Sequence, residues 1–425
     1  MRKLLLIGAL VLIGAAAFAQ TAAPAPAAAP TMAFTGALYT GTIAQAIGSS
    51  TPSLGIWDPV NQVGSRFNFQ GTVKADIWGL YFRLREDDNW NQGNSNVKVT
   101  NSTGTDKISI PSAPGFRRLY GWMEPIPQIR VVAGRLSGYE WATGDAGGFS
   151  TLGNLDGAVG AQLQIKPIDG LNFGAFLPFT YGTSGAPISG LNLNEAVNFM
   201  AFGIKYTMKG VGDIEAGYWL AANMTFPTTP TTDTTNTGSS SFYQYPKAWF
   251  GLEYVGTPNL IALVESQFAI SKTSDNNYAY FDEQVSYQMD QLGLTLYAEQ
   301  LLFASSTAGA FLGFRPVVDY TIGNVDVGAY AEIVVTTNDT GAYNGKIGYA
   351  FGPFVKVTVA KNVYMKLQPE YGGGDVTPPI SGAPLVDYPG DIGSPAYQSG
   401  NGLKQGWAPL ANAYWQVFLN FVVSF

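Results

Sequence analysis

The sequence predicts a transmembrane antiparallel β-barrel of about eighteen strands, with sixteen strands as the alternative. Three observations predict it: apolar and polar residues alternate along many segments, short and long connections alternate between these segments, and helical spacing of apolar residues is almost absent. The composition agrees, because 12% of the residues are charged and 13% are aromatic while the mean hydropathy is only +0.06. An alternating barrel has this intermediate composition, since one face of each strand is apolar and the other is polar.

The first residues, MRKLLLIGALVLIGAAAFA, are expected to be a cleavable export signal spanning 1–19. Arg2 and Lys3 precede an apolar run, and Ala17-Phe18-Ala19 has the small-residue pattern of a cleavage site. An uncleaved membrane anchor is the alternative, although the run is short for a span. Residues 20–30 form an Ala/Pro-rich spacer, which should be extended, and residues 31–425 form the expected barrel.

The segment RFNFQGTVKADI, residues 66–77, shows the alternation clearly. Phe67, Phe69 and Val73 share one parity, while Asn68 and Lys74 share the other. A strand places alternate side chains on opposite faces. A soluble sheet would turn the apolar face toward a protein core, whereas a barrel strand turns it toward lipid. The same alternation recurs in residues 159–166, 214–223, 292–299, 325–333 and 347–359.

The connections between these segments are of two kinds that alternate along the chain. Short ones are expected at Trp78-Gly79, 124–127, 167–170, 209–212, 256–258, 290–291, near 323 and near 361; the long polar ones include 86–115, 225–241 and 372–412. A barrel with short periplasmic turns and long extracellular loops has this rhythm. The first strand is placed near 32–43 and the last at 413–425. A secreted protein made of several sheets is the alternative.

The two faces of the expected strands differ in charge. Most charged residues fall on the polar parity, where a charge avoids the cost of facing lipid. Aromatic residues on the apolar parity lie mostly near strand ends, at Tyr206, Tyr254, Tyr287, Tyr320 and Phe425. Aromatic girdles of this kind are typical of the two membrane–water interfaces.

The chain contains no cysteine and no histidine. Thiol chemistry, disulfides, Cys/His metal sites and Ser-His-Asp catalysis are therefore excluded. The formal net charge of −7 argues against nucleic acid as a partner. We expect no cofactor, no metal and no enzymatic activity, because no compact pair of carboxylates stands out in the sequence.

The C-terminal segment AYWQVFLNFVVSF ends on an aromatic residue. Phe425, Val423 and Phe421 share one face, and this pattern resembles the assembly signal of Gram-negative outer-membrane proteins. It departs from that signal at Val423, where an aromatic is usual, and at Asn420, where glycine is common. With the export signal and the hairpin rhythm, the chain resembles the porins in architecture. The resemblance implies an outer-membrane location in contact with lipid, insertion by the barrel assembly machinery, a homotrimer, and passive diffusion of small hydrophilic solutes.

Porins narrow the pore with their third outer loop, which lies between strands five and six. The corresponding segment here is 138–156, and by this resemblance its Glu140, Asp145 and Asp156 would face a basic wall. That wall would consist of arginines on the preceding strands: Arg83, Arg85, Arg117, Arg118, Arg130 and Arg135. The parity of residues 116–123 is ambiguous, so Arg117 and Arg118 can both face inward only if the strand has a bulge. Charges scattered over a solvated wall are the alternative.

Aromatic residues on the polar parity suggest a second candidate site: Trp219, Trp249, Tyr297, Tyr330 and Tyr364. Rings along a lumen stack on sugars in the maltoporin-like channels, which this set resembles. Packing within the wall is the alternative, although Trp219 and Trp249 are expected on neighbouring strands. The leading functional hypothesis is a diffusion porin; a sugar- or ligand-selective channel and a non-conducting adhesin or structural barrel are the alternatives.

Overall fold

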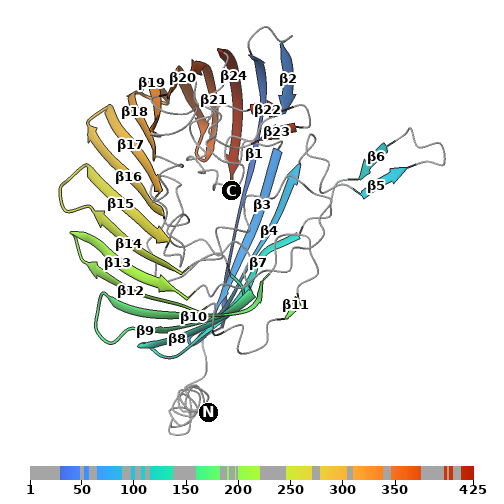
Figure 1. Ribbon diagram of the computed structural model, residues 1–425. Helices are drawn as coiled ribbons and strands as arrows, with labels where there is room; N and C mark the ends of the chain where they lie inside the picture. Colours follow the sequence, from blue (N-terminus) through green and yellow to red (C-terminus); the bar gives the residue numbers. More distant parts are fainter. Residues whose placement is uncertain are drawn as a thin grey trace.

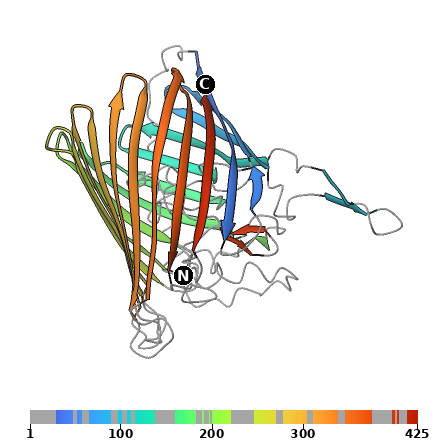
Figure 2. The same ribbon diagram turned by 90° about the horizontal axis from the view of Figure 1, so that it is seen from above.

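The computed structural model describes residues 29–47, 52–56, 65–88, 97–100, 107–110, 115–136, 159–181, 189–190, 197, 200–220, 246–269, 278–303, 310–337, 346–374, 397–399, 402–404 and 413–425. These residues form a closed, all-β, antiparallel barrel (Figure 1). The wall of the barrel is drawn side-on in Figure 2, where neighbouring strands run along one another. In the described part of the chain, no helix is long and apolar enough to span a membrane.

Eighteen strands make the wall, as predicted, rather than sixteen. In chain order they are β1 (Thr31–Ile47), β3 (Ser65–Lys74), β4 (Trp78–Asp88), β7 (Gly115–Ile126), β8 (Ile129–Arg135), β9 (Val159–Ile165), β10 (Leu171–Tyr181), β12 (Ala201–Met208), β13 (Gly212–Trp219), β14 (Lys247–Tyr254), β15 (Leu260–Ala269), β16 (Tyr278–Met289), β17 (Leu292–Phe303), β18 (Ala310–Ile322), β19 (Val325–Thr337), β20 (Lys346–Ala360), β21 (Val363–Gly374) and β24 (Tyr414–Ser424). Each strand pairs antiparallel with the next one in this series.

The first and last strands close the ring. β1 pairs with β24 from Ala37 opposite Ser424 to Ile47 opposite Tyr414. Beyond this ladder, the Gly36 amide donates to the Phe425 carbonyl at 2.8 Å, and the Phe425 amide donates back at 2.9 Å. Closure leaves no unpaired strand edge along the wall, which is the condition for a β-sheet to span a membrane.

Short strands lie outside the ring. β2 (Ser53–Ile56) pairs with the end of β1, and β11 (Ser189–Gly190) pairs with the end of β10. Two separate hairpins are formed by β5 (Val97–Thr100) with β6 (Lys107–Ile110), and by β22 (Tyr397–Ser399) with β23 (Gly402–Lys404). The β5–β6 hairpin stands away from the wall in both views (Figures 1 and 2).

The short connections fall where the sequence predicts them, with two corrections. They join β3 to β4, β7 to β8, β9 to β10, β12 to β13, β14 to β15, β16 to β17, β18 to β19 and β20 to β21. Asp290 and Asn362 take positive φ angles of 50° and 65° in two of these turns, a conformation that Asp and Asn tolerate better than most residues. The other ends of the strands carry the longer connections.

The first correction is that Trp78-Gly79 is not a turn. Both residues belong to β4, and the reversal lies at 75–77, where the Ala75 amide donates to the Trp78 carbonyl at 2.9 Å. Gly79 is needed for another reason, because a Cβ at this position would lie 2.1 Å from the Trp122 ring.

The second correction concerns residues 124–127, of which Glu124 to Ile126 extend β7 instead of forming the turn. The β7–β8 register shifts between Met123 and Ile126. Pro125 lies at this irregularity, where its missing backbone donor removes no regular ladder bond.

The two faces of the wall match the predicted parity. On β3, Phe67 keeps 41% of its surface exposed on the outer face, whereas Asn68 on the inner face keeps 5%. The outer face of the barrel is almost entirely apolar, and Tyr206, Tyr287, Tyr320 and Phe425 lie on it near the short turns. Apolar side chains of the opening segment therefore point outward, and its polar side chains point into the barrel.

Candidate functional site

The candidate site is the inner wall of the barrel, where the polar parity of each strand is collected. Arg83 on β4 lies opposite Gln70 of β3 and opposite Arg118 of β7. Its Nε donates to the Asn68 Oδ1 at 3.3 Å. In the same ladder, the backbone of Arg85 pairs with that of Asn68. The strand pairing thus places Arg83 and Arg118 side by side on the inner wall.

The structure resolves the ambiguous parity of residues 116–123 with a register shift. Arg83 pairs with Arg118, but the next residue, Leu84, pairs with Phe116, so Arg117 is the additional residue. This is the bulge that the sequence required if both arginines were to belong to one face. In the described structure, the Nε of Arg118 is buried and has no hydrogen-bond partner.

Arg130 lies on the inner wall but far from Arg83 and Arg118. Its guanidinium donates to the Glu124 carboxylate at 2.9 Å and lies 4.9 Å from the centre of the Trp122 ring. Arg130 is next to the short turn between β7 and β8, whereas Arg118 is near the opposite end of β7. With a rise of about 3.3 Å per residue, roughly 20 Å of strand separates the two levels.

Arg135 does not share the inner face with the other arginines. It pairs with Leu119 and Val159 and has the parity of Val131, whose side chain is exposed on the outer face. The residues of β8 that precede it, 131–134, are all apolar or glycine, so alternation does not show from sequence which face Arg135 occupies. The expected acidic loop, 138–156 with Glu140, Asp145 and Asp156, lies outside the described residues. It does join strands five and six of the ring, β8 and β9.

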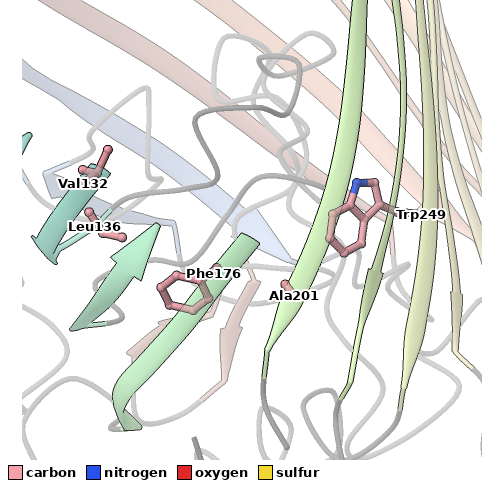
Figure 3. Close-up of a cluster of buried hydrophobic side chains, with 5 residues drawn as sticks. All are labelled: Val132, Leu136, Phe176, Ala201 and Trp249. Carbon is pink, nitrogen blue, oxygen red and sulfur yellow. The ribbon is translucent and has the colours of Figure 1, made fainter. Parts of the chain in front are cut away.

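An apolar cluster occupies part of the inner wall (Figure 3). Its buried members come from β8, the residue that follows β8, β10, β12 and β14. They are Val132, Leu136, Phe176, Ala201 and Trp249, with Tyr120, Trp122 and Trp219 packed against them. Trp249 retains only 6% of its surface exposed. Trp219 and Trp249 lie on adjacent strands, as predicted, but the burial of Trp249 favours packing within the wall over stacking on a passing sugar.

Glycine makes room for these rings. A Cβ on Gly217 would lie 2.0 Å from the Trp249 ring, so the ring lies directly over the backbone of β13. Trp122 lies over the backbone of Gly79 in the same way. Inward glycines opposite inward aromatics therefore explain part of the high glycine content of the chain.

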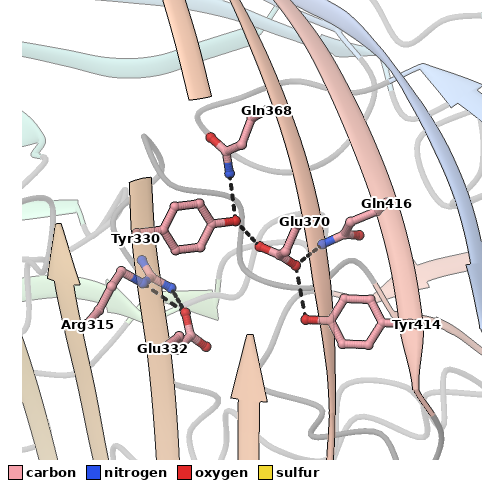
Figure 4. A network of polar contacts seen from close by, with 7 residues as sticks. All are labelled: Arg315, Tyr330, Glu332, Gln368, Glu370, Tyr414 and Gln416. Atoms are coloured by element: carbon pink, nitrogen blue, oxygen red, sulfur yellow. Dashed lines mark hydrogen bonds and ion pairs between the residues drawn. The ribbon is translucent and has the colours of Figure 1, made fainter. Parts of the chain in front are cut away.

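The three predicted tyrosines have different surroundings. Tyr297 lies opposite Gln284 and Arg315 on the inner register of β17. The Tyr364 ring lies 5.0 Å from the Lys356 ammonium. Tyr330 is buried and belongs to a larger polar network (Figure 4). The structure therefore does not bring the five predicted aromatics into one stack.

The polar network spans β18, β19, β21 and β24, and the sequence did not identify it as a unit. The Arg315 Nε donates to the Glu332 carboxylate at 2.8 Å, with a second contact from Nη2 to the same oxygen. Glu370 accepts hydrogen bonds from the Tyr330 hydroxyl, from the Tyr414 hydroxyl at 3.0 Å and from the Gln416 amide. The Gln368 amide donates to the Tyr330 hydroxyl at 3.1 Å. Glu332 is thus paired with a buried cation, whereas Glu370 is held by three neutral hydrogen-bond donors.

One feature of the sequence could have indicated this network. Three strands carry hydrogen-bonding residues at consecutive inward positions: 330 and 332, 368 and 370, 414 and 416. Tyr330 reaches Glu370 across the intervening strand β20 at Gly352, where an added Cβ would lie 3.1 Å from the tyrosine oxygen. Pairing of distant strands, rather than local pattern, brings the members together.

Charges are segregated around the inner wall. Among described side chains, β3 to β8 carry four inward cations and one carboxylate: Lys74, Arg83, Arg118 and Arg130, with Glu124. The described inward side chains of β12 to β21 include eight carboxylates and four cations: Asp213, Glu215, Glu253, Glu265, Asp319, Asp326, Glu332 and Glu370, with Lys205, Arg315, Lys356 and Lys366. β7 is the fourth strand of the ring and β17 the thirteenth, so these two arcs face each other across the barrel.

Three of the four cations named in the acidic arc form ion pairs with carboxylates of the same arc. Lys205 lies 2.8 Å from the Asp213 carboxylate, Lys356 lies 3.4 Å from Asp326, and Arg315 is paired with Glu332. The residual charge of this arc is therefore negative. Within the described residues, no group of acidic side chains is arranged to hold a metal ion.

Comparisons with solved structures give the class of fold. The anion-selective porin from Comamonas acidovorans aligns over 93% of this chain and 100% of its own, with a TM-score of 0.52 and 10% identity. OpdQ from Pseudomonas aeruginosa covers 93% of this chain and 97% of its own (TM-score 0.51, 9% identity), and a BenF-like porin from Pseudomonas fluorescens Pf-5 covers 93% and 99% (TM-score 0.51, 9% identity). No protein-family model and no curated protein matches the sequence. The chain has the eighteen-strand barrel fold of outer-membrane porins.

Proposed function

We propose that this protein is an outer-membrane porin through which small hydrophilic solutes diffuse passively. The observation that carries the proposal is a closed barrel with an apolar outer face and a charged inner wall. Lipid contacts the outer face, and solutes pass along the inner one. The fold shared with solved porins supports this function over that of a non-conducting adhesin or structural barrel, and no catalytic step is involved.

Selection in this pore rests on the two charged arcs. Solutes that cross between the basic arc of β3 to β8 and the acidic arc of β12 to β21 experience a field across the pore. Dipolar solutes orient in this field, and apolar solutes gain nothing from it. Arg83 and Arg118 are paired on the inner wall and supply a permanent positive charge there, so we expect this pair to attract anionic groups of a solute.

The further features carried over from porins belong to the same proposal. Residues 1–19 direct export, the short turns face the periplasm and the long loops face outward. The outward side chains of Phe421, Val423 and Phe425 contribute to recognition by the barrel assembly machinery, and the protein forms a homotrimer. Residues 138–156 bring Glu140, Asp145 and Asp156 toward Arg83 and Arg118 in the pore.

A sugar-selective channel is the second candidate. Aromatic rings on the inner wall, such as Tyr364 beside Lys356, favour it. The burial of Trp249 counts against it. Current measured with added maltooligosaccharide separates the two, because a channel with sugar-stacking rings is blocked by the oligosaccharide and a general diffusion pore is not.

Reversing two charges of the basic arc should change ion selectivity. In the double variant Arg83→Glu and Arg118→Glu, we expect the permeability ratio of cations to anions to rise about threefold or more, because four units of charge change beside the path. Reversal potentials measured across a salt gradient give this ratio. Arg135→Glu is the matched control, since Arg135 has the outward parity. An equal shift in the control would contradict the assignment of the basic arc.

A liposome-swelling assay tests the proposed function itself. Vesicles containing the refolded protein should swell in isotonic solutions of small sugars or amino acids, and the rate should fall as solute size increases. Vesicles that swell no faster than protein-free ones would reject passive diffusion and favour the non-conducting alternative.

A further inference from the structure

β2 and β3 follow one another along the same side of β1. Residues 42–45 of β1 pair with β2 and residues 31–39 pair with β3, while β24 lies on the other side of β1 along residues 37–47. Thr40 and Gly41 of β1 separate the two ladders. β2 and β3 therefore form one line beside β1, with an interruption opposite Thr40 and Gly41.

The interruption contains more chain than a ladder can hold. Ile56 is the last residue paired with β1 before it, and Arg66 is the first one paired after it. A regular strand would join them through two residues, opposite Thr40 and Gly41, whereas residues 57–65 lie between them. The surplus chain has to leave the wall here. We call residues 57–64 the insertion; they lie outside the described part of the chain.

The insertion leaves the wall near the middle of the membrane. Gly41 lies opposite Asn420 of β24. Trp415 and Phe425, the exposed outward aromatic residues at the two ends of this strand, are equally far from Asn420 along the chain. A strand crosses the hydrocarbon layer in about 9–11 residues, so Asn420 lies at mid-depth between two aromatic girdles. Irregular backbone at this depth cannot face lipid, because its amide and carbonyl groups would have no partner there.

The sequence of the insertion, WDPVNQVG, agrees with a position inside the barrel. Its polar residues are Asp58, Asn61 and Gln62. These side chains would be costly in the hydrocarbon layer, whereas a water-filled lumen solvates them. Its valines, Val60 and Val63, need an apolar surface to pack against.

An apolar surface of this kind lies on the inward face of β24, beside the interruption. Phe418 and Val422 lie on either side of Asn420 on this face. They keep only 1% and 3% of their surface exposed, whereas the outward Leu419 keeps 42%. Side chains that face a water-filled lumen stay accessible, as the inward Lys356 does with 37% of its side chain exposed. Protein therefore covers the inward face of β24 at this level.

We infer that the insertion folds into the barrel, packs on Phe418 and Val422, and narrows the pore at mid-depth. It rejoins the wall at β3, where Asn68 accepts a hydrogen bond from Arg83, so the narrowing lies beside the basic arc. The narrowing rests on the proposed diffusion function. The packing on β24 does not, because it requires a folded barrel and no conduction.

Disulfide formation tests the packing. The chain contains no cysteine, so an introduced pair reacts without background. In the refolded chain, we expect Val60→Cys or Val63→Cys to form a disulfide with Val422→Cys under a mild oxidant. Val423→Cys is the matched control, since Val423 is the next residue of β24 and has the outward parity. The yield with Val422→Cys should be at least about fivefold higher, because a disulfide needs its two Cα atoms within reach on one face.

Folding of each cysteine variant is checked by its compact band in cold electrophoresis. A yield with Val422→Cys no higher than with Val423→Cys, in barrels that give this band, would overturn the packing of the insertion on β24.

Single-channel conductance tests the narrowing. Replacing residues 57–65 by two threonines joins β2 directly to β3, and the conductance should then rise about 1.5-fold or more because the pore is wider. Deletion of residues 97–110 is the control, since the β5–β6 hairpin stands away from the wall (Figures 1 and 2) and its loss should leave the conductance unchanged.

The two experiments separate the inference from the proposed function. Equal conductance with and without the insertion would overturn the narrowing. If the unaltered barrel does not conduct at all, the proposed function fails and the narrowing fails with it, while the disulfide yields still decide where the insertion lies.

Discussion

Replacing Glu332 with leucine is expected to destabilise the folded barrel by about 3–5 kcal/mol. Arg315 is completely buried, and Glu332 supplies its carboxylate partner. Without that carboxylate, a guanidinium remains enclosed in the wall with its charge uncompensated. Equilibrium unfolding of the refolded protein in urea, followed by the loss of the compact band in cold electrophoresis, measures the change.

Two controls isolate the cause. Asp326→Leu removes the carboxylate of a partly exposed pair, in which Lys356 lies 3.4 Å away, and should cost less than about 1 kcal/mol. The double variant Glu332→Leu with Arg315→Met should recover most of the loss, because neither charge then remains buried. If Glu332→Leu lowers the free energy of unfolding no more than Asp326→Leu does, the Arg315–Glu332 pair is not the buried ion pair described above.

Replacing Gly217 with alanine should lower stability by about 1–3 kcal/mol, a large cost for a single methyl group. The added Cβ would lie 2.0 Å from the Trp249 ring and 2.7 Å from the Phe202 carbonyl oxygen. The ring has to leave its place over β13, and its neighbours in the apolar cluster lose contacts. The same unfolding assay reports the effect.

Gly121→Ala is the matched control, because its added Cβ would meet only the Gly79 carbonyl oxygen, at 3.4 Å. It should be tolerated. Trp249→Leu is destabilising by itself, but it should remove the part of the Gly217→Ala effect that is due to the ring, while the contact with the Phe202 carbonyl oxygen remains. Strict additivity of the two changes would show that Gly217 is not required for the placement of Trp249.

Alternation and turn rhythm were sufficient to predict most of the fold. The period of two assigns residues to a face without knowledge of the neighbouring strand, so Phe67 and Asn68 were placed correctly. The turn predicted at Trp78-Gly79 was wrong, because the glycine there has a different structural role. Gly79 indicated a turn from sequence, but its function is to accommodate Trp122 from the neighbouring strand.

The site was predicted less completely because it depends on contacts between strands. Arg83 and Arg118 are brought together by pairing of β4 with β7, and the bulge at Arg117 is visible only in that register. Tyr330, Glu370 and Tyr414 are far apart in sequence and meet across a strand, through hydrogen bonds that no local pattern reveals.

The orientation of Glu283 on β16 shows a different limit. Glu283 follows Asp282 and precedes Gln284, so the polar run itself conceals which residue faces outward. Only the register with β15 and β17 places it on the parity of Val285. A polar residue in a polar run carries no periodic signal, and the anomaly on the outer face becomes visible once neighbouring strands are known.

Single-channel recording of residues 20–425, refolded and inserted in a planar bilayer, tests the central claim most directly. An open eighteen-strand pore predicts stable conductance steps of about nanosiemens size in molar salt, because a barrel of this strand number encloses an aqueous channel. A barrel that resists heat and detergent, inserts into the bilayer and never conducts would contradict the account.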